Sequence, residues 1–284
     1  MASSGGYEDA PWLPEMYDFV PAYAGRPDVD FYVHYATEAG GPVLELGCGT
    51  GRVLTPTARA GCEVVGLDLA QNMLARCREK LRAQPTEVRS RVRLVQGDMR
   101  EFDLGRTFAL ITTPFRPFQH LITVEEQMAC LSCVRRHLSP GARFILDLFH
   151  PHPEKLNNPA LHAEQEDTAA VVLPDGRKLR RTYRIVAFHR AEQYNDVEII
   201  YYVTHSDGRT ERLVHGFPFR YLFRYEVEHL LARAGFRVAE LFGRFDRSPL
   251  RDDSPEMIFV AVKEGRGRKG NVRRSAARTG GERA

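Results

Sequence analysis

The sequence predicts an α/β protein: a doubly wound parallel sheet with an antiparallel β insert after its fifth strand. Short apolar runs alternate with helix-like segments over residues 40 to 150, which is the pattern of parallel strands joined by crossover helices. Residues 168 to 222 then hold several strand-like segments in succession, and a helical segment and two further apolar strands follow them. The first and last of these regions belong to one sheet, and the middle region interrupts it.

The first part of the chain supplies five predicted strands and the helices between them. The strands are expected at 42–46, 62–68, 91–98, 106–113 and 142–149. One helix leads from a glycine-rich loop to about residue 60, and a second helix over 69–83 carries its apolar residues on one face. A third helix begins after Thr123, because Glu126 three residues on completes a capping box, and the "SPG" of 139–141 ends it.

The insert reads as a series of antiparallel hairpins. "PDG" (174–176), a polar connector near 190–196 and "SDG" (206–208) separate its strand-like segments. Helical periodicity returns after residue 222 and stops at Gly235. The insert strands are expected at 168–173, 179–189, 196–205 and 209–222, and the two closing strands at 237–243 and 256–262.

The charge distribution and the cysteine content limit the kinds of protein that this chain can be. The net charge of +3 is concentrated at the end of the chain, because seven Arg or Lys and only two Glu follow residue 263. The remaining residues carry a charge of about −2, so we expect a disordered basic tail over 264–284 on a body that is not basic. Five scattered cysteines indicate free thiols in the cytoplasm. Neither a signal peptide nor a membrane-spanning run is predicted.

The stretch "VLELGCGTGRVLTP" (43–56) indicates a ligand that contains adenosine. Gly47, Gly49 and Gly51 follow the first strand, where residues without side chains let backbone N–H groups approach a ligand. Asp68 ends the second strand seventeen residues after Gly51 and can accept hydrogen bonds from ribose hydroxyls. A nicotinamide dinucleotide and S-adenosylmethionine both satisfy these observations. The G-x-G-x-G spacing, followed by Arg52, departs from the dinucleotide pattern and disfavours an oxidoreductase.

The combination of "ELGCGTGR", Asp68 and the "GDM" of 97–99 resembles the class I S-adenosylmethionine-dependent methyltransferases. The resemblance covers about residues 40–150 and 223–263, and it implies a seven-stranded Rossmann-like sheet and S-adenosylmethionine as the cofactor. It places the glycine loop beside the methionine part, Asp68 at the ribose, and Asp98 with Met99 around the adenine. The full set of expected cofactor-binding residues is Glu45, Gly47, Cys48, Gly49, Gly51, Arg52, Asp68, Leu69, Met73, Asp98, Met99, Thr113 and Tyr17.

The loop after the fourth strand, "TPFRPFQHL" (113–121), bears on the methyl acceptor. Enzymes that methylate amines of nucleic-acid bases often carry Asn or Asp, two prolines and an aromatic residue here, and this chain does not. The loop instead resembles those of the small-molecule branch, which includes sugar-amine and glycine N-methyltransferases. The resemblance therefore implies transfer of a methyl group to a nitrogen or oxygen atom of a small-molecule acceptor. The residues expected to contact that acceptor are Phe115, Arg116, Phe118 and Tyr221.

His120 is the expected catalytic residue. Methyl transfer from a sulfonium is an in-line displacement whose leaving thioether needs no acid, so the protein has to align the acceptor and remove any proton it carries. Histidine titrates near neutral pH and suits that task. The alternative is that His120 only hydrogen-bonds the backbone and holds the loop in shape.

The resemblance also suggests how the chain is divided. Residues 1–40 form an N-terminal helical lid, residues 41–150 and 223–263 form the cofactor-binding core, and residues 151–222 form an insert over the acceptor pocket. Cys130 and Cys133 form a C-x-x-C motif without a second cysteine pair, which favours buried packing over a metal site. We expect a monomer or homodimer. A nicotinamide-dependent oxidoreductase and a non-catalytic S-adenosylmethionine-binding protein remain the alternatives.

Overall fold

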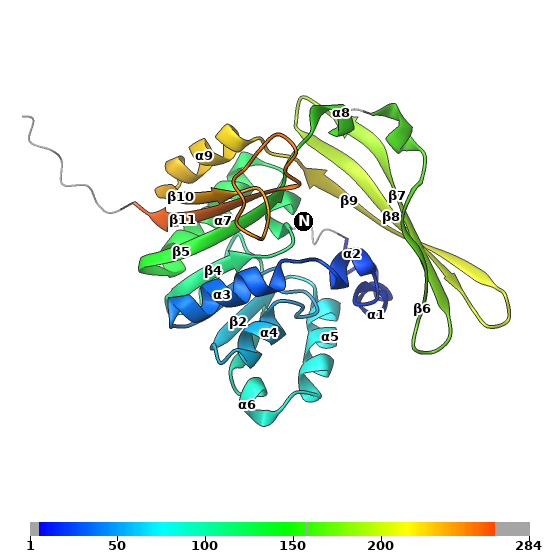
Figure 1. Ribbon diagram of the computed structural model, residues 1–284, viewed down its shortest axis with the longest axis horizontal. Helices are drawn as coiled ribbons and strands as arrows, with labels where there is room; N and C mark the ends of the chain where they lie inside the picture. The colour runs from blue at the N-terminus through cyan, green and yellow to red at the C-terminus, as the bar shows by residue number, and fades with distance from the viewer. Residues whose placement is uncertain (1–5, 157, 265–284) are drawn as a thin grey trace, which may run out of the picture.

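The structure is a computed structural model that describes residues 6–156 and 158–264, so the predicted basic tail lies outside the described residues except for Glu264. Figure 1 shows a central sheet covered by helices on both faces, with a second sheet standing beside it. The central sheet has seven strands in the order β10-β11-β5-β4-β1-β2-β3. This arrangement confirms the predicted doubly wound sheet.

Five parallel strands form the middle and one edge of the central sheet, and two antiparallel strands complete the other edge. Strand β11 inserts antiparallel between β5 and β10. The observed bounds lie close to the predicted ones except at β5, which begins four residues early, so the "SPG" lies inside the strand. The strands are β1 (Val43–Leu46), β2 (Val64–Asp68), β3 (Val92–Gln96), β4 (Phe108–Thr113), β5 (Leu138–Phe149), β10 (Phe236–Phe242) and β11 (Glu256–Lys263).

Amphipathic helices cover the two faces of this sheet. Helix α7 begins with the predicted capping box, in which the Thr123 hydroxyl accepts the Glu126 N–H at 3.2 Å and the Glu126 carboxylate accepts the Thr123 N–H at 3.1 Å. One buried cluster packs α7 and α9 on the first face, and another packs α3, α4 and α5 on the second. The helices are α3 (Val29–Ala39), α4 (Leu54–Arg59), α5 (Gln71–Arg82), α6 (Thr86–Arg89), α7 (Val124–His137) and α9 (Arg224–Arg233).

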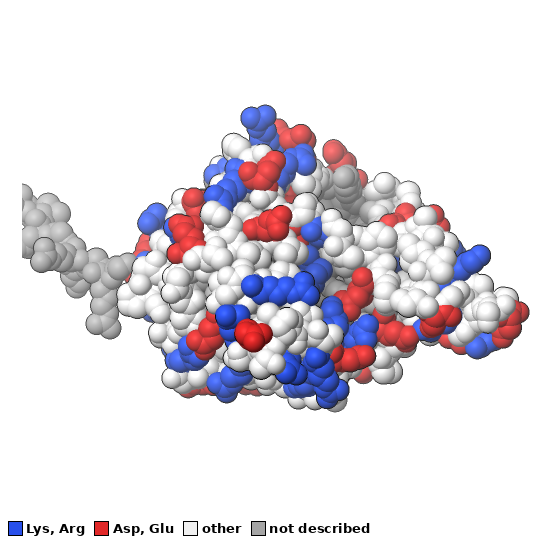
Figure 2. All heavy atoms as spheres, turned by 60° about the horizontal axis from the view of Figure 1, so that its bottom comes forward, with Lys and Arg blue, Asp and Glu red and all other residues white. Residues whose placement is uncertain are grey.

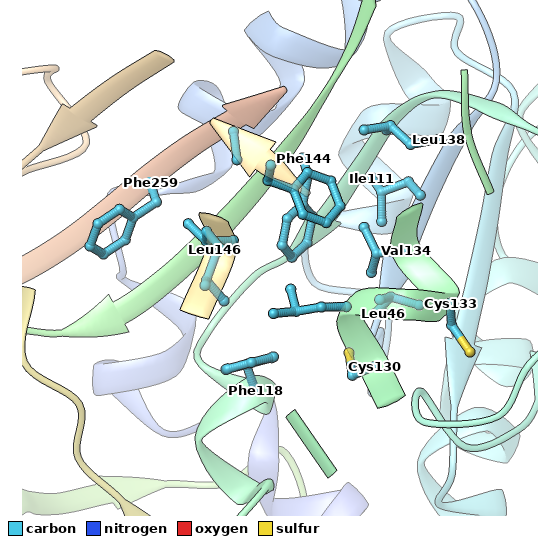
Figure 3. Close-up of a cluster of buried hydrophobic side chains, with 14 of the residues drawn as sticks. Leu46, Ile111, Phe118, Cys130, Cys133, Val134, Leu138, Phe144, Leu146 and Phe259 are labelled. Carbon is cyan, nitrogen blue, oxygen red and sulfur yellow. The ribbon is translucent and has the colours of Figure 1, made fainter. Parts of the chain in front are cut away.

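The first buried cluster is drawn in Figure 3. Leu46, Ile111 and Phe144 project from the sheet toward Cys130 and Cys133 of α7. Both cysteines are buried, and the Cys133 thiol also donates to the Arg100 carbonyl at 3.3 Å, so the C-x-x-C motif serves packing as predicted. All five cysteines are unpaired.

The insert forms a separate four-stranded antiparallel sheet in the order β6-β7-β8-β9. Its position after β5 and its hairpin connections confirm the predicted β insert. Two short helices, α8 (Pro153–Leu156) and η2 (Pro159–His162), lead into it. Figure 1 shows this sheet projecting away from the central one. The insert strands are β6 (Gln165–Val172), β7 (Lys178–His189), β8 (Tyr194–Thr204) and β9 (Thr210–Arg220).

Residues 6–40 divide between two environments. Helices α1 (Leu13–Tyr17) and α2 (Pro21–Ala24) lie near the insert, and Leu13 and Met16 pack with Leu179 and Tyr201 of its inner face. Helix α3 instead packs on the central sheet. Residues 6–24 are therefore the part of the predicted lid that lies between the two sheets. No helix in the described part of the chain is long and apolar enough to cross a membrane.

Candidate active site

A cavity opens at the carboxyl ends of the central strands, where open α/β sheets bind their ligands. The glycine loop, the ends of β2 and β3, the loop after β4 and the N-terminal segment all contribute to its walls. Most of the residues predicted from the sequence meet here. Those that line the cavity are Tyr17, Glu45, Gly47, Cys48, Gly49, Arg52, Asp68, Leu69, Met73, Asp98, Met99, Phe115 and His120.

The glycine loop is bent as a close approach to a ligand requires. Gly47, Gly49 and Gly51 have φ values of 69°, 52° and 81°, which side chains disfavour. A Cβ atom on Gly47 would lie 2.6 Å from Cβ of Pro117, so Gly47 also lets the loop after β4 approach β1. Gly51 does not line the cavity; a Cβ atom there would lie 2.6 Å from Sγ of Cys77, so Gly51 serves packing against α5.

Asp68 is held at the cavity wall by two backbone groups. Its Oδ2 accepts the Gly49 N–H at 2.7 Å and its Oδ1 accepts the Ala70 N–H at 2.9 Å. Burial raises the pKa of this carboxyl above its usual range. Because each carboxylate oxygen can accept a second hydrogen bond, Asp68 can receive two hydroxyl groups from a ribose without releasing the loop.

Asp98 has a stronger partner than the sequence indicated. Arg100 donates to its Oδ1 at 2.9 Å and its Oδ2 at 2.6 Å, and the same guanidinium reaches Glu126 of α7 at 2.5 Å. The pKa of Asp98 is lowered, since the hydrogen bonds from Arg100 outweigh the effect of burial. Asp98 and Met99 line the cavity as predicted, but the Asp98 carboxylate is largely occupied by Arg100.

Glu45 and Arg52 lie at the glycine-loop end of the cavity. Arg52 makes a two-pronged ion pair with Asp28, with distances of 2.5 and 2.7 Å. Glu45 is buried, and burial raises the pKa of its carboxyl to about 8 despite the nearby Arg52. Glu45 is therefore mostly protonated near neutral pH. The charged side chains at this end of the cavity are Arg52 and its partner Asp28.

His120 also lines the cavity, at the end of the 3-10 helix η1 (Pro117–His120). Aromatic rings surround its imidazole: Tyr7 at 5.9 Å, Phe217 at 5.1 Å and Phe219 at 5.3 Å between ring centroids. Its Nδ1 is buried and has no hydrogen-bond partner within the described residues. Burial, with a smaller contribution from His215, lowers the pKa of His120 to about 4. The imidazole is thus neutral at physiological pH.

Several predicted site residues have other positions. Phe118 was expected to contact the acceptor, but the structure places its ring, fully buried, in the core cluster of Figure 3. Thr113 is fully buried and donates to the Ile145 carbonyl at 3.2 Å. Tyr221 is buried against Phe223, and Arg116 is paired with Glu256. None of these four side chains lines the cavity, because core packing or an ion pair holds each of them elsewhere.

The sequence signals did not identify every residue that belongs to the site. Tyr7 lines the cavity and places its ring between His120 and His215, 4.6 Å from the latter. It lies in a glycine-rich stretch where nothing indicated an ordered contact. Asp147 does not line the cavity but accepts the backbone N–H of Phe115, which does, at 3.1 Å. A carboxylate inside the apolar strand "FILDLF" is a sequence signal by which this residue could have been found. Within the described residues, no group of three or more His, Cys, Asp or Glu side chains could hold a metal ion.

Comparison with known proteins agrees with this geometry. Residues 43–141 match the model of a family described as a methyltransferase domain. A dTDP-3-amino-3,4,6-trideoxy-alpha-D-glucopyranose N,N-dimethyltransferase of Streptomyces venezuelae is 29% identical over 76% of this chain and 84% of its own. The cypemycin N-terminal methyltransferase of a Streptomyces species is 26% identical over 79% of this chain and 84% of its own.

A solved structure extends the similarity to nearly the whole chain. The CcbJ methyltransferase from Streptomyces caelestis aligns over 93% of this chain and all of its own, with a TM-score of 0.73 and 26% identity. The cofactor of these enzymes fits the cavity, since Asp68 and the bared glycine backbone lie where an adenosine ligand needs them. The geometry and these similarities together support a class I S-adenosylmethionine-dependent methyltransferase, in which residues 43–141 match the methyltransferase domain.

Proposed function

We propose that the enzyme transfers the methyl group of S-adenosylmethionine to an amino nitrogen of a small-molecule acceptor that binds beside His120. The observation that carries this proposal is the neutral, unpartnered Nδ1 of His120 at an aromatic end of the cofactor cavity. The names of two relatives support it, because one is an N,N-dimethyltransferase of an amino sugar and the other methylates the N-terminus of a peptide.

Residues at the glycine-loop end would hold the cofactor. Asp68 would accept the ribose hydroxyls, Leu69, Asp98 and Met99 would enclose the adenine, and the backbone of the glycine loop would face the methionine part. When bound, S-adenosylmethionine supplies an electrophilic methyl group on a sulfonium, and its departure leaves a neutral thioether. No acid is therefore required from the protein, and Glu45, protonated near neutral pH, need not act as one.

Residues at the His120 end would prepare the acceptor. The rings of Tyr7, Phe115, Phe217 and Phe219 exclude water, and a neutral His120 can accept a hydrogen bond from an amine N–H. Of the carboxyl groups that line the cavity, Glu45 is mostly protonated, Asp68 would be occupied by the ribose and Asp98 is paired with Arg100, so none is left as a partner for an ammonium ion. We infer that the amine enters without its extra proton, with its lone pair free to attack.

The pKa of about 4 makes His120 a weak base, so its contribution is alignment of the nitrogen. Of the two tasks expected of His120 from the sequence, alignment of the acceptor and removal of its proton, His120 keeps the first. Proton abstraction by a group titrating near neutral pH would have contributed roughly 10²–10⁴-fold. A hydrogen bond that fixes the angle of attack contributes less, and it does so across the whole neutral pH range.

The test uses a matched pair of acceptors. S-adenosylmethionine carrying a labelled methyl group is incubated with the enzyme and with a nucleotide-linked amino sugar, or with the same sugar bearing a hydroxyl in place of the amine. We expect label on the amino sugar and none on the hydroxy sugar. Label on the hydroxy sugar alone would favour O-methylation. Absence of label on any member of a wide amine panel would favour a cofactor-binding protein without turnover.

The remaining predictions concern setting and partners. The cytoplasmic location and the monomeric or homodimeric state stay predictions. Composition argues against nucleic acid as the acceptor, and on the face seen in Figure 2 Lys and Arg side chains are mixed with Asp and Glu side chains. An oxidoreductase would need a nicotinamide cofactor, which titration with NADH can check against S-adenosylhomocysteine.

A further inference from the structure

The loop that carries Phe115 and His120 contains an unfavourable backbone conformation. Phe115 and Arg116 follow β4 and have φ values of 64° and 71°, so two successive residues with large side chains adopt the left-handed conformation. The other non-glycine residues of the described chain with positive φ, Gln193 and Arg247, are isolated. Such a conformation persists only where surrounding contacts enforce it, and it clusters at functional sites.

Two carboxylates on adjacent strands enforce it here. Asp147 of β5 accepts the backbone N–H of Phe115 at 3.1 Å. Glu256 of β11 receives the Arg116 guanidinium on both carboxylate oxygens, at 2.8 and 2.7 Å. Each of the two strained residues is thus held by its own acid, and the two acids come from neighbouring strands of a rigid sheet.

A third residue joins the two acids. Arg26 follows the N-terminal helices and is almost fully buried; it binds Asp147 at 2.8 Å, Glu256 at 3.1 Å and Asp28 at 3.0 Å. Its guanidinium also lies 5.0 Å from the centre of the Phe115 ring. Asp28 in turn binds Arg52 at the cavity. Arg26, Arg52 and Arg116 therefore balance Asp28, Asp147 and Glu256, and removal of one member leaves the cluster with an uncompensated charge.

Phe115 shows what this cluster positions. Phe115 lines the cavity, and its ring contacts the guanidinium groups of Arg26 and Arg52 and packs in a T-shaped arrangement with Tyr23. The segment after Arg116 turns at once into η1, which ends with His120. A change in the backbone at residues 115 and 116 therefore moves both the aromatic wall and the imidazole.

We propose that Arg26, Asp147 and Glu256 are positioning residues for methyl transfer: they hold Phe115 and Arg116 in the left-handed conformation and thereby fix Phe115 and His120 at the acceptor end of the cavity. This inference rests on the proposed function in one respect, namely that the acceptor binds beside His120. The cluster does not touch the reacting atoms. Its effect is on the acceptor and on the geometry of attack, with little effect on the affinity for the cofactor.

The first test is Glu256→Gln, which keeps the size of the side chain and removes its charge. We expect kcat/KM for the acceptor to fall by about tenfold to a hundredfold, as a misplaced reacting group requires, with the affinity for S-adenosylhomocysteine changed less than about threefold. The matched control is Glu63→Gln, which removes the acid of a surface ion pair with Arg106 of similar length, 2.6 Å, and should leave both values unchanged. Equal losses in acceptor turnover and cofactor affinity would overturn the proposal.

A second pair of variants tests the backbone itself. Arg116→Ala and Arg116→Gly both remove the ion pair, but only glycine adopts a φ near 71° without steric cost. We expect Arg116→Gly to retain at least about threefold more acceptor kcat/KM than Arg116→Ala. Equal activity of the two variants, or a more active alanine variant, would show that the left-handed conformation does not matter.

Hydrogen exchange supplies a readout independent of turnover. In Glu256→Gln and in Arg116→Ala with S-adenosylhomocysteine present, the amides of residues 115, 116 and 118–121 should exchange at least about tenfold faster than in the parent, and amides of the glycine loop should not. Unchanged exchange at residues 115, 116 and 118–121 would overturn the inference even if no acceptor is known. An enzyme that shows the expected exchange but methylates no amine would instead contradict the proposed function.

Discussion

Asp68→Ala is the change with the clearest expected effect on cofactor binding. The substitution removes the oxygens that would accept the ribose hydroxyls, together with the acceptors of the Gly49 and Ala70 N–H groups. A hydrogen bond to a charged group contributes about 1.5–3 kcal/mol. If water replaces the other contacts, the loss of one such hydrogen bond lowers the affinity for the cofactor by about tenfold to a hundredfold. The loosened loop can only add to that decrease.

The assay is calorimetric titration of S-adenosylhomocysteine into the parent and the variants. Asp68→Asn should behave nearly as Asp68→Ala does, because its amide NH₂ would face one of the two backbone N–H groups. Asp103→Ala is the matched control: this exposed carboxylate accepts the N–H of Gly105 two residues on, as Asp68 does with Ala70, but it does not line the cavity. A folded Asp68→Ala protein with the parent's affinity would refute the assignment of the ribose site.

Three further predictions follow from the cavity walls. His120→Gln should lower acceptor kcat/KM by no more than about tenfold, and the parent's profile should show no inflection near pH 6.5 from this residue, since its pKa is about 4; a hundredfold loss would restore His120 as the base. Glu45 keeps a proton in the folded state that the unfolded chain releases, so stability should fall as pH rises from 4.5 through about 8. The Tm of Glu45→Gln should therefore gain on the parent's between pH 6 and pH 9, whereas a constant difference would contradict the raised pKa. The contacts of Tyr7 with His120 and His215 are made by its ring. Tyr7→Phe should therefore keep acceptor kcat/KM within about threefold of the parent's value, and Tyr7→Ala should lower it about tenfold. Equal losses in the two variants would assign the effect to the hydroxyl.

The fold followed from the sequence because its signals are local. Short apolar runs identified every strand of the central sheet, and the capping box at Thr123 placed α7 correctly. The start of β5 was missed because Gly141, with a φ of 76°, forms an irregularity inside the strand and not a break before it. The short helix α6 has only one buried residue, Val88, and so gives no periodic signal.

The candidate site also has a part that local sequence signals predict and a part that they do not. The cofactor side depends on residues close to strand ends, so motif spacing identified Gly47, Asp68 and Met99 as residues that line the cavity. The acceptor side depends on segments far apart in the chain. Nothing local indicated that Glu256 would pair with Arg116 across 140 positions, or that Tyr7 would meet His120. Phe118 illustrates the same limit, because Pro117 and His120 of its loop line the cavity while its own ring packs in the core.

A crystal structure of the enzyme with S-adenosylhomocysteine and an amine acceptor tests the central claim most directly. We predict the ribose on Asp68, the sulfur at the end of the cavity formed by Phe115 and His120, and the acceptor nitrogen within hydrogen-bond reach of the His120 imidazole, among the rings contributed by β9. A nitrogen that lies on the far side of Phe115, with His120 contacting only protein groups, would contradict it.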